Sequence, residues 1–309
     1  MGEDFVLDAA FAAQQAEQFR SDQVGRIVQN AVTTTSVDTV SLDRDVFNGI
    51  DPTTSERLDS WSVTNQRHSG RCWEFAGLNV IRAQVMRNLN IDNLEFSQNH
   101  IAFFDKIEKV NFAFARAVET IDLPDGDEQV RELLGELSDG GYWPQFVDIV
   151  GKYGLVPQWA MPDTESSGNT DRMNRALEKI VRRVVGQIRT ARGADDRDTR
   201  IAAAREQGLK DAWRVLAIHL GTPPTSFTWQ YRDKDKNFHR EGTFTPTQFA
   251  RHIVPGDLDE YVTVQHDPRT ENPVGQGYVR EHTPYMVGRP GYSYCLLYTS
   301  DAADERSSV

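Results

Sequence analysis

The clearest helical pattern in this chain begins at Cys72 and continues to about Leu89. Its first half is apolar almost all round, at Trp73, Phe75, Ala76, Leu78, Val80 and Ile81. Its second half alternates apolar with polar residues. A helix that is apolar on every side must be surrounded by other elements. The pattern therefore predicts a helix whose start is buried in a core and whose end, from Arg82 to Asn88, reaches solvent.

A second long helix is expected from Ser97 to Thr120. Its apolar residues recur every three or four positions, at Ile101, Phe104, Ile107, Val110, Phe114 and Val118. Ser97 is a good N-terminal cap, because its hydroxyl can accept a hydrogen bond from the first turn. The aromatic residues are predicted to be core rather than a cofactor site. We assign His100, one turn into the helix, to a polar face or a capping role.

Weaker patterns lie on either side of these two helices. Residues 8–31 predict a helix broken near Ser21 and Asp22, and 33–58 predict an extended arm. The expected elements further on are a short helix at 128–137, charged helices at 175–189 and 202–219, a hairpin formed by 226–231 and 237–244, a short helix from Thr245 to His252, and a strand at 261–264.

A polar loop, Thr64–Arg71, leads directly into the helix that begins at Cys72. A thiol at a helix N-terminus faces unpaired backbone N–H groups and the positive end of the helix dipole, which favour the nucleophilic thiolate. The Gln66 amide and the Cys72 N–H would form a two-donor oxyanion hole. A lone cysteine is more often an inert core residue. The combination with Gln66, Gly70 and Trp73 favours a nucleophile.

The stretch from Asn65 to Ala76 resembles the nucleophile segment of papain-like cysteine peptidases, whose signature shares the Gly-x-Cys-Trp core. The matching residues are Asn65–Gln66, Ser69–Gly70 and Cys72–Ala76. Together with Leu78–Val80 and Glu95–Gln98, they resemble more narrowly the bleomycin hydrolase or aminopeptidase C branch, from about Asn30 to about Tyr292. The resemblance implies an α+β papain-like fold with a helical insertion, and a cysteine-type aminopeptidase that cleaves peptide bonds through an acyl-enzyme on Cys72.

Glu74 departs from the family pattern, which has an apolar residue at this position. A carboxylate one step beyond the nucleophile's neighbour would disfavour the thiolate, or the side chain would simply point outward. The sequence leaves both possibilities open.

The segment Ser138–Trp143 resembles the Gly-Gly segment that lines the substrate cleft in this family. A substrate backbone can lie against Gly140 and Gly141 only because no Cβ blocks it. An ordinary turn is the alternative, and the Cys72 motif upstream favours the cleft. The resemblance assigns Gly140, Gly141 and Trp73 to substrate binding.

The chain contains two cysteines, Cys72 and Cys295, and no disulfide framework. Secreted papain-like enzymes join two cysteines at the positions that match Ser69 and Ser138. The serines indicate a reducing compartment, and we expect a cytoplasmic protein.

A thiolate peptidase also needs a base and an orienting group, which papain-like enzymes supply as a histidine and an asparagine. No matching segment is found, and the tail from Cys295 to Arg306 resembles translated sequencing-adapter sequence. We therefore expect a chain that stops before the catalytic His and Asn, with an incomplete C-terminal β half, and that is inactive alone. The alternative is a catalytically silent scaffold or oligomerisation fragment.

The resemblance also divides the chain. The expected parts are an N-terminal arm and helix (1–58), the helical half with the nucleophile (59–160), an inserted oligomerisation region (161–225), the start of the β half (226–292) and a non-native tail (293–309).

Composition narrows the functional class. The 309 residues carry a net charge of −12, which gives no electrostatic support for nucleic-acid binding. No apolar run is long enough to span a bilayer. The histidines lack a paired ligand spacing, so neither a metal nor another cofactor is expected. The expected partners are peptide substrates and further copies of the chain, since relatives form hexamers.

Overall fold

The computed structural model describes residues 8–50, 62–132, 137–261, 263–265, 277–280, 286–288 and 292–296. The chain separates into two compact units, Met1–Asp59 and Ser60–Val309, which are described one at a time. Within the described residues, no helix is both long enough and apolar enough to cross a membrane.

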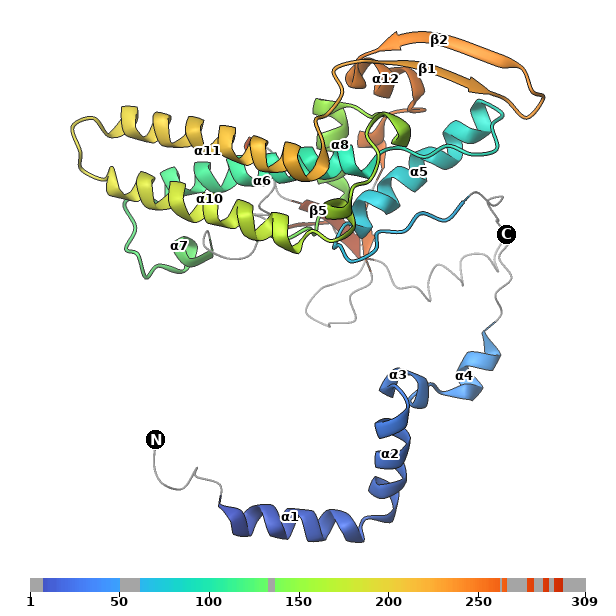
Figure 1. Cartoon of the computed structure of the whole chain (residues 1–309), viewed down its shortest axis with the longest axis vertical. Helices are drawn as coiled ribbons and strands as arrows, with labels where there is room; N and C mark the ends of the chain where they lie inside the picture. The colour runs from blue at the N-terminus through green and yellow to red at the C-terminus, as the bar shows by residue number, and fades with distance from the viewer. Residues whose placement is uncertain are drawn as a thin grey trace. The chain divides into compact units, whose positions relative to one another are not determined.

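In the described part of the first unit, residues 8–50, the chain forms four helices: α1 (Ala9–Ser21), α2 (Gln23–Thr34), α3 (Val37–Val40) and α4 (Arg44–Gly49) (Figure 1). The predicted break is confirmed at Asp22, whose side chain accepts a hydrogen bond from the Gly25 N–H and so starts α2. The extended arm predicted over 33–58 is wrong where α3 and α4 form. Ser36 and Asp43 cap these two helices, which local polar side chains can do without any apolar periodicity.

The second unit is a helical assembly built around α6 (Gln98–Glu119). The other helices are α5 (Cys72–Asn88), α7 (Glu128–Glu132), α8 (Trp143–Tyr153), α9 (Glu165–Gly168), α10 (Asp171–Thr190), α11 (Arg197–Leu220) and α12 (Pro246–Ile253), with short 3₁₀ turns η2 (Gln158–Ala160) and η3 (Leu258–Glu260). α6 runs alongside α10 and α11, and it also contacts α5 and α8 (Figure 1). The predicted helices at 97–120, 175–189 and 202–219 are confirmed.

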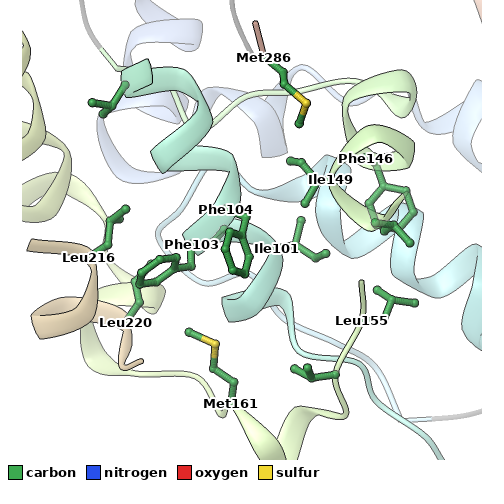
Figure 2. Packing of buried hydrophobic residues seen from close by; sticks show 14 of the residues in the cluster. Ile101, Phe103, Phe104, Phe146, Ile149, Leu155, Met161, Leu216, Leu220 and Met286 are labelled. Carbon is green, nitrogen blue, oxygen red and sulfur yellow. The ribbon is translucent and has the colours of Figure 1, made fainter. Parts of the chain in front are cut away.

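The core lies on both sides of α6. Figure 2 shows Phe103 and Phe104 near Leu216 and Leu220 of α11, and Ile101 towards Phe146 and Ile149 of α8. The Ser97 hydroxyl caps the helix by accepting the His100 N–H at 3.0 Å, as predicted. His100 itself is not on a polar face. It is buried, its ring contacts Phe104, and burial lowers its pKa to about 4.

Helix α5 is buried further along than its sequence pattern predicts. Leu78 and Ile81 are buried, as expected for the first half. Arg82, which we placed at the solvent-exposed end, is buried too, because its guanidinium donates to the Ser62 carbonyl at 2.7 Å. At Gly77, a Cβ would lie 2.8 Å from the Phe146 ring, so this glycine permits close packing of α5 on α8.

The predicted hairpin is confirmed. β1 (Phe227–Arg232) pairs antiparallel with β2 (Phe238–Phe244), with a register shift between Trp229 and Gln230. Next comes α12, which begins with a capping box at Thr245 and packs on β2. The strand predicted at 261–264 is wrong at Tyr261 and Thr263 and is confirmed only at Val264. Tyr261 follows the 3₁₀ turn η3, and the strand begins only at Val264.

A second, three-stranded sheet has the order β3-β5-β4, formed by Val264–Gln265, Tyr292–Leu296 and Gly277–Arg280. β5 is parallel to β3 and antiparallel to β4. It therefore takes in the start of the tail that we expected to be non-native. His266, His282 and residues 297–309 lie outside the described residues.

Gly154 carries the chain out of α8 in a conformation that only glycine adopts easily, with φ +75°. A Cβ at this position would lie 2.1 Å from the carbonyl carbon of Pro246. The next residue, Leu155, donates its N–H to the Pro246 carbonyl at 3.1 Å. The end of α8 is thus seated directly on the start of α12.

Candidate active site

Cys72 is the first residue of α5, and its side chain is exposed. The preceding residue, Arg71, is the N-cap but its side chain makes no capping hydrogen bond. The thiol therefore lies at the uncapped N-terminus of a 17-residue helix, where backbone N–H groups favour a negative charge. This is the environment that the sequence predicted for Cys72.

The loop before Cys72 is folded tightly on itself and on a distant segment. The Ser69 hydroxyl donates to the Gln66 carbonyl at 2.7 Å, and Arg71 Nε donates to the same hydroxyl at 3.1 Å. The His68 N–H donates to the Gly168 carbonyl at 3.0 Å. Gln66 is half-buried, and its backbone is fixed six residues before the nucleophile. The oxyanion hole that we assign to Gln66 and the Cys72 N–H stays a prediction.

The Gly-Gly segment is fastened to this loop through Asp139. The Gly70 N–H donates to Asp139 Oδ2 at 3.1 Å, and the Trp73 indole N–H donates to the Asp139 carbonyl at 2.8 Å. The nucleophile loop and the segment Ser138–Gly141 are therefore in direct contact, although 69 positions separate Gly70 from Asp139. This juxtaposition is what a cleft beside Cys72 requires.

The backbone of Gly141 packs directly against the ring of Trp73. A Cβ at Gly141 would lie 2.4 Å from the Trp73 ring, so the position accepts no side chain. Trp73 is half-buried, and the Lys109 ammonium lies 5.9 Å from its ring centroid. The contact supports a need for glycine here, while the substrate-binding roles of Trp73, Gly140 and Gly141 stay predictions.

Two buried lysines of α6 hold the glycine segment from beneath. Lys106 Nζ pairs with Asp139 Oδ1 at 2.6 Å and donates to the Ser138 carbonyl at 3.0 Å. Lys109 Nζ pairs with Asp105 Oδ2 at 2.8 Å and donates to the Gly140 carbonyl at 2.7 Å. Backbone carbonyls that would otherwise face a buried interior are thereby satisfied.

The pKa values of the two acids of this cluster are shifted in opposite directions. Burial by itself raises the pKa of Asp139, but Lys106 and hydrogen bonds from Lys106, Thr170 and Asn174 together hold that pKa well below its usual range. Burial raises the pKa of Asp105, against the opposing effects of Lys109 and Lys106. Asp139 is thus a carboxylate at neutral pH.

Glu74 is buried, so the possibility that it points outward is ruled out. Burial raises the pKa of Glu74 well above its usual range, although Arg71 opposes the shift. Neither carboxyl oxygen has a hydrogen-bond partner among the described residues. The raised pKa reduces the negative charge that Glu74 places near Cys72.

A family comparison decides what this arrangement is. The family described as "Peptidase C1-like family" matches residues 6–299. The chain belongs to the peptidase C1-like family. Aminopeptidase C of Lactobacillus delbrueckii subsp. lactis is 33% identical over 263 residues, which cover 85% of this chain and 59% of that protein. Bleomycin hydrolase of Rattus norvegicus is 33% identical over 289 residues, which cover 91% of this chain and 64% of that protein.

The fold comparison agrees. The crystal structure of PepW from Lactobacillus rhamnosis superposes with a TM-score of 0.87 at 31% identity, covering 97% of this chain and 68% of that chain. The papain-like α+β fold and the bleomycin hydrolase or aminopeptidase C resemblance are thereby confirmed. The chain spans about six-tenths of the length of the two relatives above.

Peptidases of this family need a base for the thiol, and the histidines whose contacts are described point elsewhere. His219 Nδ1 lies 2.7 Å from the Ser166 hydroxyl, and His239 Nε2 lies 2.9 Å from Asp233 Oδ2. His252 faces Glu241, and His100 is buried against Tyr153. Within the described residues, the Cys72 thiol makes no hydrogen bond.

Sequence reasoning missed Asp139, Lys106 and Lys109 as parts of the site. A signal was present for Lys106, which lies three positions after Phe103 and four before Val110, in line with their buried face. A lysine in an apolar stripe requires a buried counter-charge. Asp139 carried no such signal, because its partners come from four separate segments.

Proposed function

We propose that this chain carries the nucleophile and the substrate-aligning segment of a cysteine-type aminopeptidase of the bleomycin hydrolase type. The observation that carries the proposal is the exposed Cys72 at the uncapped start of α5, fastened through Gly70 and Trp73 to the Gly140–Gly141 segment. A nucleophile beside a fixed, side-chain-free backbone segment is the arrangement that acyl transfer on an extended peptide needs.

In the proposed reaction, the Cys72 thiolate attacks the carbonyl carbon of a peptide bond. The carbonyl π electrons move to oxygen, where the Gln66 amide and the Cys72 N–H donate hydrogen bonds to the resulting oxyanion. When the carbonyl re-forms, the C–N bond breaks and the amine leaves with a proton. Water then hydrolyses the thioester and restores the thiol. A base must take and return the proton.

Substrate alignment is assigned to Gly141. Within the described residues its N–H and carbonyl make no hydrogen bond, whereas the Gly140 carbonyl is held by Lys109. An extended peptide would pair with the free N–H and carbonyl of Gly141 in the manner of an added strand. Substitution of Gly141 by Ala would force the Trp73 ring aside, and we expect it to weaken substrate binding.

The test is hydrolysis of an aminoacyl p-nitroanilide by the protein extended to the full length of its relatives, so that a catalytic base is present. The proposal expects release of nitroaniline that Cys72→Ala abolishes and that iodoacetamide blocks, while Cys295→Ser leaves the rate unchanged. Activity that persists in Cys72→Ala would exclude this assignment.

A catalytically silent scaffold is the second candidate. It is favoured by the absence of a hydrogen bond between Cys72 and any described histidine. No nitroaniline release from a folded chain, together with Cys72 alkylation no faster than that of a free thiol, would favour this second function over the first.

Two finer assignments belong with the main proposal. We assign the protein to the cytoplasm, because Ser69 and Ser138 make polar contacts where a secreted enzyme would use cysteines; the Ser138 hydroxyl accepts the Gly140 N–H at 3.0 Å. We also assign self-association to the region of α10 and α11. Sedimentation at several protein concentrations would test this assignment, and a monomer throughout would contradict it.

A further inference from the structure

One residue with a buried side chain, Asp139, contacts several segments around the candidate site. Asp139 Oδ2 accepts the Gly70 N–H and the Thr170 hydroxyl, and Oδ1 accepts Asn174 Nδ2 at 2.8 Å and pairs with Lys106. Its backbone carbonyl accepts the Trp73 indole. The nucleophile loop, α6 and the start of α10 therefore meet at a single carboxylate, and α5 contacts the backbone carbonyl of the same residue.

We propose that Asp139 is a positioning residue that fixes the nucleophile loop and the first turn of α5 against the glycine segment. The inference rests on the proposed function, since it concerns how Cys72 is presented. It assigns to Asp139 no contact with the substrate or with the reacting atoms.

The chemistry of the carboxylate makes this role specific. An ionised carboxylate offers about four acceptor positions and no donor. Four donors occupy Asp139, and its side chain is only 8% exposed. An amide of the same shape would turn an NH₂ group towards either Gly70 and Thr170 or Lys106 and Asn174. Asparagine therefore cannot satisfy the same set of partners.

The hydrogen bond between Gly70 and Asp139 matters because Gly70 is so near the nucleophile in the chain. Gly70 lies between Gln66 and Cys72, and a Cβ on it would lie 3.0 Å from the Asp139 Cβ. The hydrogen bond from Gly70 to Asp139 thus ties the loop down two residues before the nucleophile. Ser69 and Ser138, each one residue earlier, occupy the positions that match the disulfide of secreted papain-like enzymes. The buried Asp139 joins the same two segments without a covalent bond.

The experiment measures the rate at which iodoacetamide alkylates Cys72 between pH 5 and pH 9, in the full chain carrying Cys295→Ser. Asp139→Asn is compared with the unsubstituted background. The matched control is Glu108→Gln, which also removes a buried carboxylate paired with a lysine, Lys152, but touches neither the loop nor the glycine segment. Urea unfolding of each variant records any general loss of stability.

Positioning predicts that Asp139→Asn slows alkylation at pH 7 about tenfold and moves the midpoint of the rate profile to higher pH, because a displaced first turn stabilises the thiolate less. Glu108→Gln should stay within twofold at a comparable loss of stability. If Asp139→Asn acted only by removing a negative charge near the thiol, the change in rate would be in the opposite direction, because the thiolate would be favoured and alkylation would be faster. An unchanged or faster rate in Asp139→Asn overturns the proposal.

If Asp139→Asn does not fold, Asn174→Ala decides. It removes one donor to Asp139 Oδ1 and should slow alkylation two- to threefold, and an unchanged rate overturns the proposal.

The background protein, which carries only Cys295→Ser, separates the failure of the positioning role from the failure of the proposed function. If its Cys72 reacts no faster than a free thiol, the proposed function fails. If Cys72 is reactive but indifferent to Asp139, only the positioning role fails.

Discussion

Helix α6 has two buried sides that differ in chemistry. Towards α10 and α11 it presents apolar side chains such as Phe103 and Phe114, both fully buried. Towards the glycine segment it presents Asp105, Lys106 and Lys109, also buried, each with a specific partner. Apolar packing tolerates substitutions of similar volume, whereas a buried ionic network is satisfied in one arrangement only. The apolar side mainly supplies stability, and the polar side fixes the position of the glycine segment.

The largest effect is expected on the apolar side. Phe114→Ala would leave a cavity beside Gly208, where a Cβ would already lie 2.9 Å from the Phe114 ring. We expect a loss of about 4 kcal/mol in the free energy of unfolding, measured in urea. Phe114→Leu, as the control, should lose less than half of this. A loss below about 1 kcal/mol for Phe114→Ala would contradict close packing at this site.

On the polar side, Lys106→Met would leave Asp139 buried without its counter-charge. Asp139 keeps three hydrogen bonds, so we expect a loss of about 3 kcal/mol at pH 7. Because the folded-state pKa of Asp139 is lowered, its stabilising effect is complete above the unfolded value near 4 and is lost at lower pH. The difference in unfolding free energy between wild type and variant should begin to shrink as pH falls below about 4, towards the lowered folded-state pKa of Asp139. A difference that is constant from pH 7 to pH 3 would argue against the ionic contribution.

His100 lies in the first turn of α6, against the end of α8, and should make stability depend on pH. Its folded-state pKa of about 4 is below the unfolded value of about 6.5, so neutral His100 stabilises above pH 6.5 and this is lost as pH falls towards 4. Between pH 7 and pH 5 the contribution is about 2 kcal/mol. His100→Phe should flatten the dependence of unfolding free energy on pH by this amount. An equal slope in both proteins would show that folding leaves the pKa of His100 unchanged.

The smallest effect is expected from Ile101→Val, which removes one methylene from a fully buried side chain. We expect a loss of about 1 kcal/mol with no dependence on pH. The rate of Cys72 alkylation should not change. A change in that rate would break the separation between the two sides of α6.

The sequence predicted those features that depend on local pattern. The periodicity of α6, α10 and α11 and the alternation in β1 and β2 identified these elements, and the motif around Cys72 identified the family. Buried polar residues were missed, because a charge is ordinarily exposed and its partner is not visible in a linear pattern. Arg82, His100 and Glu74 are each buried by contacts with distant segments. The short helices α3 and α4 were not predicted, because they begin at capping residues and have no apolar periodicity.

The close packing of Gly154 against the backbone of Pro246 has a consequence for biosynthesis. The exit of α8 cannot reach its final position until the start of α12 has left the ribosome, because the Leu155 N–H donates its hydrogen bond to the carbonyl of Pro246, a later residue. The scaffold around Cys72 is therefore completed late in translation, although the nucleophile itself is made early. A nascent chain arrested before residue 246 should hold α5 and α8 in a looser, more protease-sensitive state than one arrested well beyond it.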